Sequence, residues 1–137
     1  MNKYDNAMME TARVWAKQSH CIRNKVGAII SKDGRIVSNG YNGTVHGADN
    51  CCEEGNEKVV SKNSVVHAEA NAILFAVKNG ITTNGCKVYI TLSPCIECAK
   101  MIVQSGITEV LYQTEYRDTT GIEFLKENSI QVRQILV

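Results

Sequence analysis

Two short segments of the sequence carry the side chains best suited to bind one metal ion. Residues 67–69 read His-Ala-Glu, and residues 94–98 read Pro-Cys-Ile-Glu-Cys. Cysteines three positions apart fall on the same face of a helix, so both sulfurs can reach one ion. The N-terminus of a helix also favours the thiolate, because the positive end of the helix dipole lies there. The spacing therefore predicts that His67, Cys95 and Cys98 bind one Zn²⁺.

A zinc ion with three protein ligands keeps its fourth tetrahedral position for water, which is typical of a catalytic centre. Glu69 follows His67 by two residues, so it cannot easily bind the same ion but can lie beside that water. Because zinc lowers the pKa of such a water towards roughly 7, a neighbouring carboxylate can accept its proton. We predict Glu69 as the catalytic proton shuttle. The alternatives are a structural zinc knuckle, or a helix-capping histidine beside two buried thiols.

Helix and strand patterns alternate around these segments. The predicted elements are helices at 2–18, 66–77, 95–105 and 120–127, and strands at 26–31, 35–40, 87–92, 109–112 and 130–137. Between the first two strands, the Asp33-Gly34 pair favours a hairpin turn. Strands separated by helices predict an α/β fold whose sheet is covered on both faces.

Three details of this pattern bear on the site. Residues 42–63 have no period and predict a loop of about 20 residues, long enough to expect a functional reason. The helix at 66–77 is apolar on nearly every side, which predicts a helix buried all round. Pro94 can open the first turn of the helix at 95–105, and Cys86, which opens a strand, is interpreted as a core residue.

Composition limits the classes of function. The 137 residues predict one domain over 1–137, and 15 basic against 14 acidic residues predict no nucleic-acid partner. The first ten residues lack the apolar core of a signal peptide, and no run of roughly 18 apolar residues predicts a membrane span. We therefore expect a cytoplasmic protein, in the host cytoplasm if it is viral. In that compartment the six cysteines are expected to be metal ligands or buried thiols rather than disulfides.

The motif His-x-Glu with Pro-Cys-x-x-Cys is that of the zinc-dependent nucleobase deaminases. Together with Gly-Tyr-Asn-Gly at 40–43, the segments at 67–73 and 91–100 resemble the deoxycytidylate deaminases of bacteria and phages. The resemblance runs from about residue 25 to residue 112. It implies a three-layer α/β/α domain, with a mixed five-stranded sheet, that converts dCMP to dUMP and ammonia. Water would add to C4 of cytosine while Glu69 protonates N3.

The resemblance also implies regulation, assembly and further site residues. The family is usually a homohexamer, activated by dCTP and inhibited by dTTP, with Mg²⁺ accompanying the nucleotide effector. The effector site would be bordered by Gly40, Tyr41, Asn42 and Gly43. Asn42 also matches an asparagine that contacts the substrate sugar, and we assign Ala68 and Ser93 to substrate binding. At 44–47 this chain lacks the proline usual in the family, which leaves effector regulation open.

Some phage members hold a second, structural zinc. Its candidate ligands here are His20, Cys21, Cys51 and Cys52, with His46 as a further donor. Free thiols in a reducing cytosol are the alternative interpretation.

The 5′-phosphate of a nucleotide requires cationic or donor groups. Arg23 precedes the first strand, whereas Tyr116 and Arg117 follow the strand at 109–112. Ligands of open α/β sheets bind beyond the carboxyl ends of strands, which favours Tyr116 and Arg117, although exposed arginines are often simply solvated. The rival functions are deamination of dCTP or of (deoxy)cytidine, a tRNA adenosine deaminase, and a zinc-stabilised module that only binds deoxynucleotides.

Overall fold

The computed structural model describes residues 2–54 and 60–136. Its helices are α1 (Asp5–Ala16), α2 (Ala68–Lys78), α3 (Ile96–Gln104) and α4 (Thr120–Glu127). The longer strands are β1 (Gly27–Lys32), β2 (Arg35–Tyr41), β7 (Lys87–Leu92), β8 (Glu109–Thr114) and β9 (Gln131–Gln134). Four two-residue strands are β3 (Gly43–Thr44), β4 (Glu53–Glu54), β5 (Val60–Ser61) and β6 (Val65–Val66). Within the described ranges, no helix has both the length and the apolar character needed to cross a bilayer.

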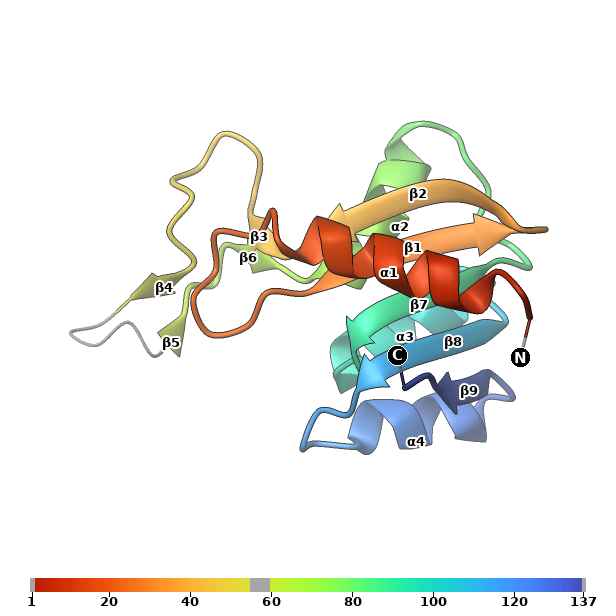
Figure 1. The fold of residues 1–137 in the computed structure, drawn as a ribbon. Helices are drawn as coiled ribbons and strands as arrows, with labels where there is room; N and C mark the ends of the chain where they lie inside the picture. Colours follow the sequence, from red (N-terminus) through yellow and green to blue (C-terminus); the bar gives the residue numbers. More distant parts are fainter. Residues whose placement is uncertain (1, 55–59, 137) are drawn as a thin grey trace.

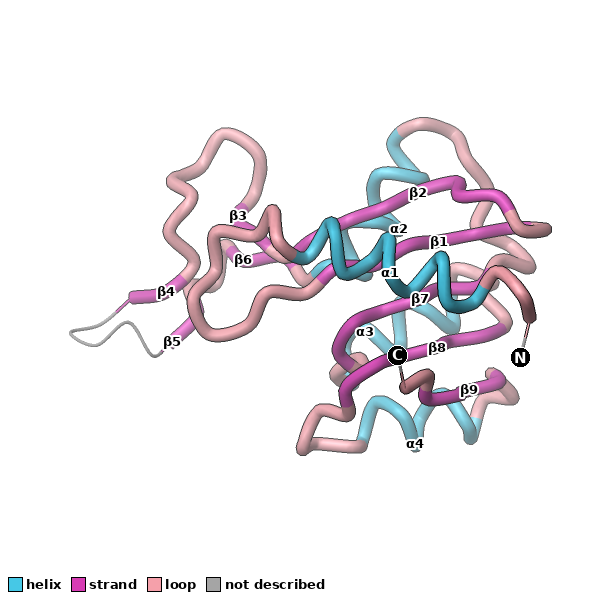
Figure 2. Tube along the Cα trace, viewed as in Figure 1, coloured by secondary structure: helices cyan, strands magenta, loops and turns pink. Residues whose placement is uncertain are grey.

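The five longer strands form one mixed sheet in the order β2-β1-β7-β8-β9. Strand β1 pairs antiparallel with β2 and β7, whereas β7, β8 and β9 run parallel. Alternate residues of the strands enter two separate cores: Ile29, Tyr89 and Leu111 pack with residues of α1, and Ile30, Val88 and Val110 pack with residues of α2, α3 and α4. The three-layer α/β/α fold and its five-stranded mixed sheet are therefore confirmed (Figures 1 and 2).

The hairpin prediction is also confirmed. Strand β1 ends at Lys32 and β2 begins at Arg35, so Asp33 and Gly34 alone make the turn. Both have positive φ, 52° and 77°. A two-residue turn of this kind matches the right-handed twist of the paired strands, and glycine adopts it without steric cost.

Three expectations about the elements were wrong. Helix α2 is not buried all round, because it packs on one face of the sheet and leaves Leu74, Phe75 and Val77 exposed on its outer side. Helix α3 begins after Cys95, its N-cap residue, so Pro94 lies before the helix rather than in its first turn. The stretch 42–63 is not all loop, since β3 pairs with β6 and β4 with β5; residues 55–59 of it lie outside the described residues, as does residue 137 of the last predicted strand.

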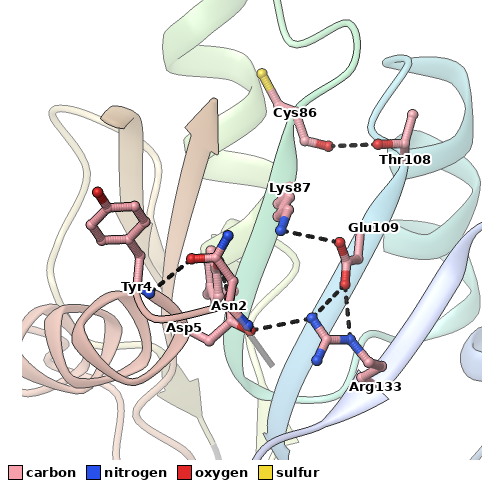
Figure 3. Close-up of polar contacts among 9 residues, drawn as sticks. Asn2, Tyr4, Asp5, Cys86, Lys87, Thr108, Glu109 and Arg133 are labelled. Atoms are coloured by element: carbon pink, nitrogen blue, oxygen red, sulfur yellow. Dashed lines mark hydrogen bonds and ion pairs between the residues drawn. The ribbon is translucent and has the colours of Figure 1, made fainter. Parts of the chain in front are cut away.

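A buried polar cluster fixes α1 to the sheet (Figure 3). The Tyr89 hydroxyl donates to Asp5 Oδ1 at 2.6 Å, and Arg133 donates both to Asp5 Oδ2 at 3.2 Å and to Glu109 Oε2 at 2.7 Å. Burial alone would raise the pKa of Asp5, but the hydrogen bonds from Tyr89 and Arg133 outweigh it and hold that pKa below its ordinary value. The cluster joins α1, β7, β8 and β9 on the face of the sheet opposite α2. Lys87 extends it through an ion pair with Glu109.

The two glycines at 40 and 43 have different roles. A Cβ on Gly40 would collide with the carbonyl oxygen of Ala68 and lie 2.7 Å from the backbone nitrogen of Ala72, whereas a Cβ on Gly43 would meet nothing within 4 Å. Gly40 thus lets β2 approach α2, the helix that begins beside His67.

We expect Gly40→Ala to lower the free energy of unfolding by about 1–3 kcal/mol or more, because β2 and α2 must move apart. Gly43→Ala is the matched control and should change it by less than about 1 kcal/mol, since the added methyl group has open space. Urea unfolding of both variants measures the difference. Equal effects would contradict the close approach of β2 to α2.

Candidate active site

The candidate site lies at the edge of the sheet where β7 and β8 end and β1 begins. The Gly27 amide, at the start of β1, donates to Thr91 Oγ1 near the end of β7 at 3.2 Å. Ser93 and Tyr116 follow β7 and β8 at this edge, and the Tyr116 amide donates to Ser93 Oγ at 2.7 Å. His67 and Cys95 are the N-cap residues of α2 and α3, so both helices direct their N-termini towards the site. Helix dipoles therefore favour anionic groups here.

His67, Cys95 and Cys98 converge in the structure. The Nδ1 atom of His67 lies 3.6 Å from Cys95 Sγ and 3.4 Å from Cys98 Sγ. Zinc bonds of about 2.3 Å to sulfur and about 2.0 Å to nitrogen, at a tetrahedral angle, would separate such atoms by about 3.5 Å. One imidazole and two thiolates of this spacing therefore fit zinc, with Nδ1 as the histidine donor atom.

The electrostatics of the cluster favour its ligating form. The hydrogen bonds from Cys98 and His67 lower the pKa of Cys95 to about 3, so this sulfur is a thiolate at neutral pH. The hydrogen bond to that thiolate, together with burial, raises the pKa of Cys98. The hydrogen bond to Cys95 likewise raises the pKa of His67. A cation placed among the three groups would hold both sulfurs in the thiolate form.

Glu69 lies in the first turn of α2, with only 4% of its surface exposed. Burial raises its pKa to about 7, despite the opposing effect of His67. A carboxyl group with this pKa can both accept and release a proton near neutral pH, as a general acid and base must. It lines the same cavity as His67 and Cys95.

Most of the predicted substrate residues border this cavity. Arg23, Asn42, Ala68, Ser93 and Tyr116 line it together with Glu69. Arg117 is exposed and is not among the lining residues, although it follows Tyr116 directly. Of the two residues expected beyond the end of β8, Tyr116 therefore borders the cavity, whereas Arg117 lies at an exposed bend beside it.

Asn42 is largely engaged within the chain. Its Oδ1 accepts from the Val26 amide at 2.8 Å, and its Nδ2 donates to the Asn24 carbonyl at 2.8 Å. Its own carbonyl accepts from Ser19 Oγ at 2.8 Å. A primary amide has two donor hydrogens, so one remains for a ligand in the cavity. Asn42 thus braces the segment before β1 and still faces the cavity.

The other residues assigned to an effector site lie apart from the cavity lining. Tyr41 is exposed and stacks on Trp15 of α1, with ring centroids 6.3 Å apart. Gly40 is packed against α2, and Gly43 is half-buried in the strand β3.

The expectation that none of the cysteines forms a disulfide was wrong. Cys21 and Cys52 are joined by one, with their Cα atoms 5.0 Å apart. Disulfide sulfurs are not thiolates, so in this state the pair cannot serve the second zinc site proposed for it. Glu53 lies near the two sulfurs and would complete a possible metal-binding group with them. His20, which is exposed, and Cys51 are outside this group. Cys86 is fully buried without a disulfide, as expected of a core residue.

Several cavity residues were not among the predicted site residues. They come from the segment before β1, from the long loop and from β6: Asn24, Val26, Glu53, Ser61 and Val65. Glu53 is the most buried of them, with 2% of its surface exposed. An acidic residue in an aperiodic stretch carries no local signal, so only the path of the chain could reveal its place in the cavity.

Comparisons with known proteins agree with the geometry. Residues 2–114 match the family model described as the cytidine and deoxycytidylate deaminase zinc-binding region. The deoxycytidylate deaminase of Enterobacteria phage T4 is 35% identical over 150 residues, covering 81% of this chain and 78% of the phage protein. ComE operon protein 2 of Bacillus subtilis is 35% identical over 134 residues, covering 96% of this chain and 71% of that protein. The crystal structure of the dCMP deaminase of cyanophage S-TIM5, in complex with dCMP and dUMP, superimposes with a TM-score of 0.93 at 39% identity, covering 98% of this chain and 99% of that one.

Proposed function

This chain belongs to the cytidine and deoxycytidylate deaminase zinc-binding family, and we propose that it hydrolyses dCMP to dUMP and ammonia. The observation that carries the proposal is the convergence of His67, Cys95 and Cys98 beside the buried carboxyl group of Glu69. The likeness to a dCMP deaminase that binds dCMP and dUMP supports this substrate.

His67 Nδ1 and the sulfurs of Cys95 and Cys98 would hold the zinc ion. Bound zinc supplies Lewis acidity, which lets a water molecule lose its proton near neutral pH. Glu69 accepts that proton and transfers it to N3 of the cytosine as the oxygen adds to C4. The same carboxyl group then takes the proton of the new C4 hydroxyl group and delivers it to the exocyclic nitrogen, which leaves as ammonia while the C4 carbonyl forms. Its pKa of about 7 suits both transfers.

Recognition of the nucleotide is assigned to the remaining cavity residues. Asn42 has an amide hydrogen available for the sugar, and the cavity surface at Ala68 and Ser93 lies beside the metal ligands. Among the described residues that line the cavity, Arg23 is the one arginine or lysine, so it is our first candidate for the 5′-phosphate. Tyr116 lines the same cavity, and Arg117 becomes the weaker candidate.

For regulation and assembly, the proposal adopts what the resemblance to the deoxycytidylate deaminases implies. We propose a homohexamer whose activity responds to dCTP and dTTP with Mg²⁺, through the segment Gly40–Tyr41–Asn42–Gly43. A second zinc would require reduction of the Cys21–Cys52 disulfide. The whole activity is assigned to a single domain without a nucleic-acid partner.

Parallel assays of ammonia release from dCMP, dCTP, deoxycytidine and CMP test the function, each with and without dCTP or dTTP as effector. We expect dCMP to give the highest kcat/KM. Equal values for dCMP and deoxycytidine would favour a nucleoside deaminase, and no release from any of them would favour a deoxynucleotide-binding module. The nearly balanced charge of the chain speaks against a tRNA adenosine deaminase, which needs a basic surface.

We expect Arg23→Ala to raise KM for dCMP roughly 10- to 150-fold, the range of one lost charge-assisted hydrogen bond of about 1.5–3 kcal/mol. Deoxycytidine lacks the phosphate, so its KM should change little. Arg117→Ala should raise KM for dCMP less. Arg35→Ala is the matched control, because Arg35 is an exposed arginine at the hairpin end of β2. A larger KM effect for Arg117→Ala than for Arg23→Ala would assign the phosphate to Arg117.

A further inference from the structure

The segment between α1 and β1 forms part of the cavity wall without any regular secondary structure of its own. It carries Arg23 and Asn24, both of which line the cavity. On one side Asn42 holds it, through the bonds to Ser19 and Asn24 described above. On the other side the long loop holds it at two adjacent residues, Cys52 and Glu53.

Glu53 makes the polar contact between the long loop and the segment that carries Arg23. Its Oε2 accepts from two consecutive amides, that of Ile22 at 2.8 Å and that of Arg23 at 3.0 Å. Hydrogen bonds to a carboxylate are about twice as strong as neutral ones, and one oxygen that binds both amides fixes the plane of the peptide between them. The backbone from which the Arg23 side chain extends is therefore oriented by Glu53.

The covalent contact lies immediately beside it. Cys21 precedes Ile22 and Cys52 precedes Glu53, so the disulfide and the two hydrogen bonds join the same two segments. Beyond these contacts, the loop around Glu53 is held by the short ladder of β4 and β5 and by the Lys62 amide, which donates to the Cys52 carbonyl at 2.7 Å.

Both hydrogen bonds from the backbone amides go to one oxygen of the Glu53 carboxylate, Oε2, and leave the other oxygen unused. Oε1 is buried and has no hydrogen-bond partner among the described residues. Because Glu53 also lines the cavity, its role extends beyond the packing of the loop. Direct contact of Glu53 with the substrate phosphate is unfavourable, because two anions repel each other.

We propose that Glu53 is a positioning residue, which orients Arg23 towards the 5′-phosphate of the nucleotide. The proposal rests on the proposed function, in which Arg23 binds that phosphate. Glu53 acts only through Arg23, so its removal affects phosphate-bearing substrates and leaves the nucleoside reaction unchanged.

Steady-state kinetics of Glu53→Ala with dCMP and with deoxycytidine test this. We expect KM for dCMP to rise about 10-fold or more with kcat nearly unchanged, and kcat/KM for deoxycytidine to stay within about 3-fold of wild type. Glu53→Gln keeps an acceptor oxygen for the two amides and should restore most of the affinity. Glu54→Ala, at the exposed neighbour in β4, is the matched control.

A double-mutant cycle shows whether Glu53 works through Arg23. In an Arg23→Ala background, Glu53→Ala should raise KM for dCMP less than about 2-fold further. Cys52→Ser releases the same loop without changing Glu53, and should raise KM for dCMP selectively even if Glu53→Ala proves too unstable to assay.

The proposal is overturned if these variants impair dCMP and deoxycytidine equally, if KM for dCMP is unchanged, or if it falls because the carboxylate competes with phosphate. It is also overturned if the effects of the two residues simply add. A zinc-loaded wild type that fails to deaminate dCMP would reject the proposed function itself. A wild type that prefers dCMP but tolerates Glu53→Ala would reject the positioning role alone.

Discussion

Glu69→Gln is expected to lower kcat by at least about 10²-fold, the lower range for a lost general acid and base. Glutamine keeps nearly the same shape but cannot accept and return a proton at neutral pH. The protein should still bind one zinc per chain, since the three ligands are His67, Cys95 and Cys98. Single-turnover deamination of dCMP, with metal content measured on the same preparation, tests the expectation.

The pH profile separates catalysis from damage to the fold. In the wild type, the Glu69 pKa of about 7 should make kcat change with pH near neutrality. Glu69→Gln should lack this change. Glu10→Gln, at an exposed position of α1, is the matched control and should retain both activity and profile. A zinc-loaded Glu69→Gln enzyme within a few-fold of wild-type kcat would contradict the role of Glu69.

Loss of the metal is expected to abolish deamination altogether. Cys98→Ser should remove a ligand that is 4% exposed and lies 3.4 Å from His67 Nδ1, and should bring zinc well below one per chain. Chelation of the wild type should likewise remove activity, and added Zn²⁺ should restore it, because thiolate and imidazole donors favour this ion.

Cys86→Ser is the control for the metal experiment, because Cys86 is buried outside the site and its thiol contacts the Thr82 carbonyl. It should retain one zinc per chain and full activity. A fully active protein without metal would refute the mechanism. Two zinc ions per chain after reduction of Cys21–Cys52 would instead show that the second site forms from thiols.

Features whose physical cause is local could be predicted from the residues alone. The spacing of Cys95 and Cys98 and the two-residue interval from His67 to Glu69 depend only on the geometry of a helix start, so the ligand set could be predicted. The Asp33–Gly34 turn follows from the backbone preferences of two residues, and the three-layer architecture follows from the alternation of helices and strands.

The sequence was a poorer guide to what surrounds each helix. The apolar residues of α2 indicated burial on all sides, yet Leu74, Phe75 and Val77 are exposed in the single chain. Hydrophobicity alone does not say how many neighbours a helix has. Gly40 shows the same limit, since its contact with α2 depends on how β2 and the helix pack.

Some contacts between residues far apart in the sequence could be found only in the folded chain. The Cys21–Cys52 disulfide joins residues 31 apart, and no local pattern indicated it. The contact of Glu53 with the amides of Ile22 and Arg23 depends on the path of the long loop after β2. That loop has no periodic pattern, because its course is set by a few long-range bonds whose partners leave no mark on the neighbouring sequence.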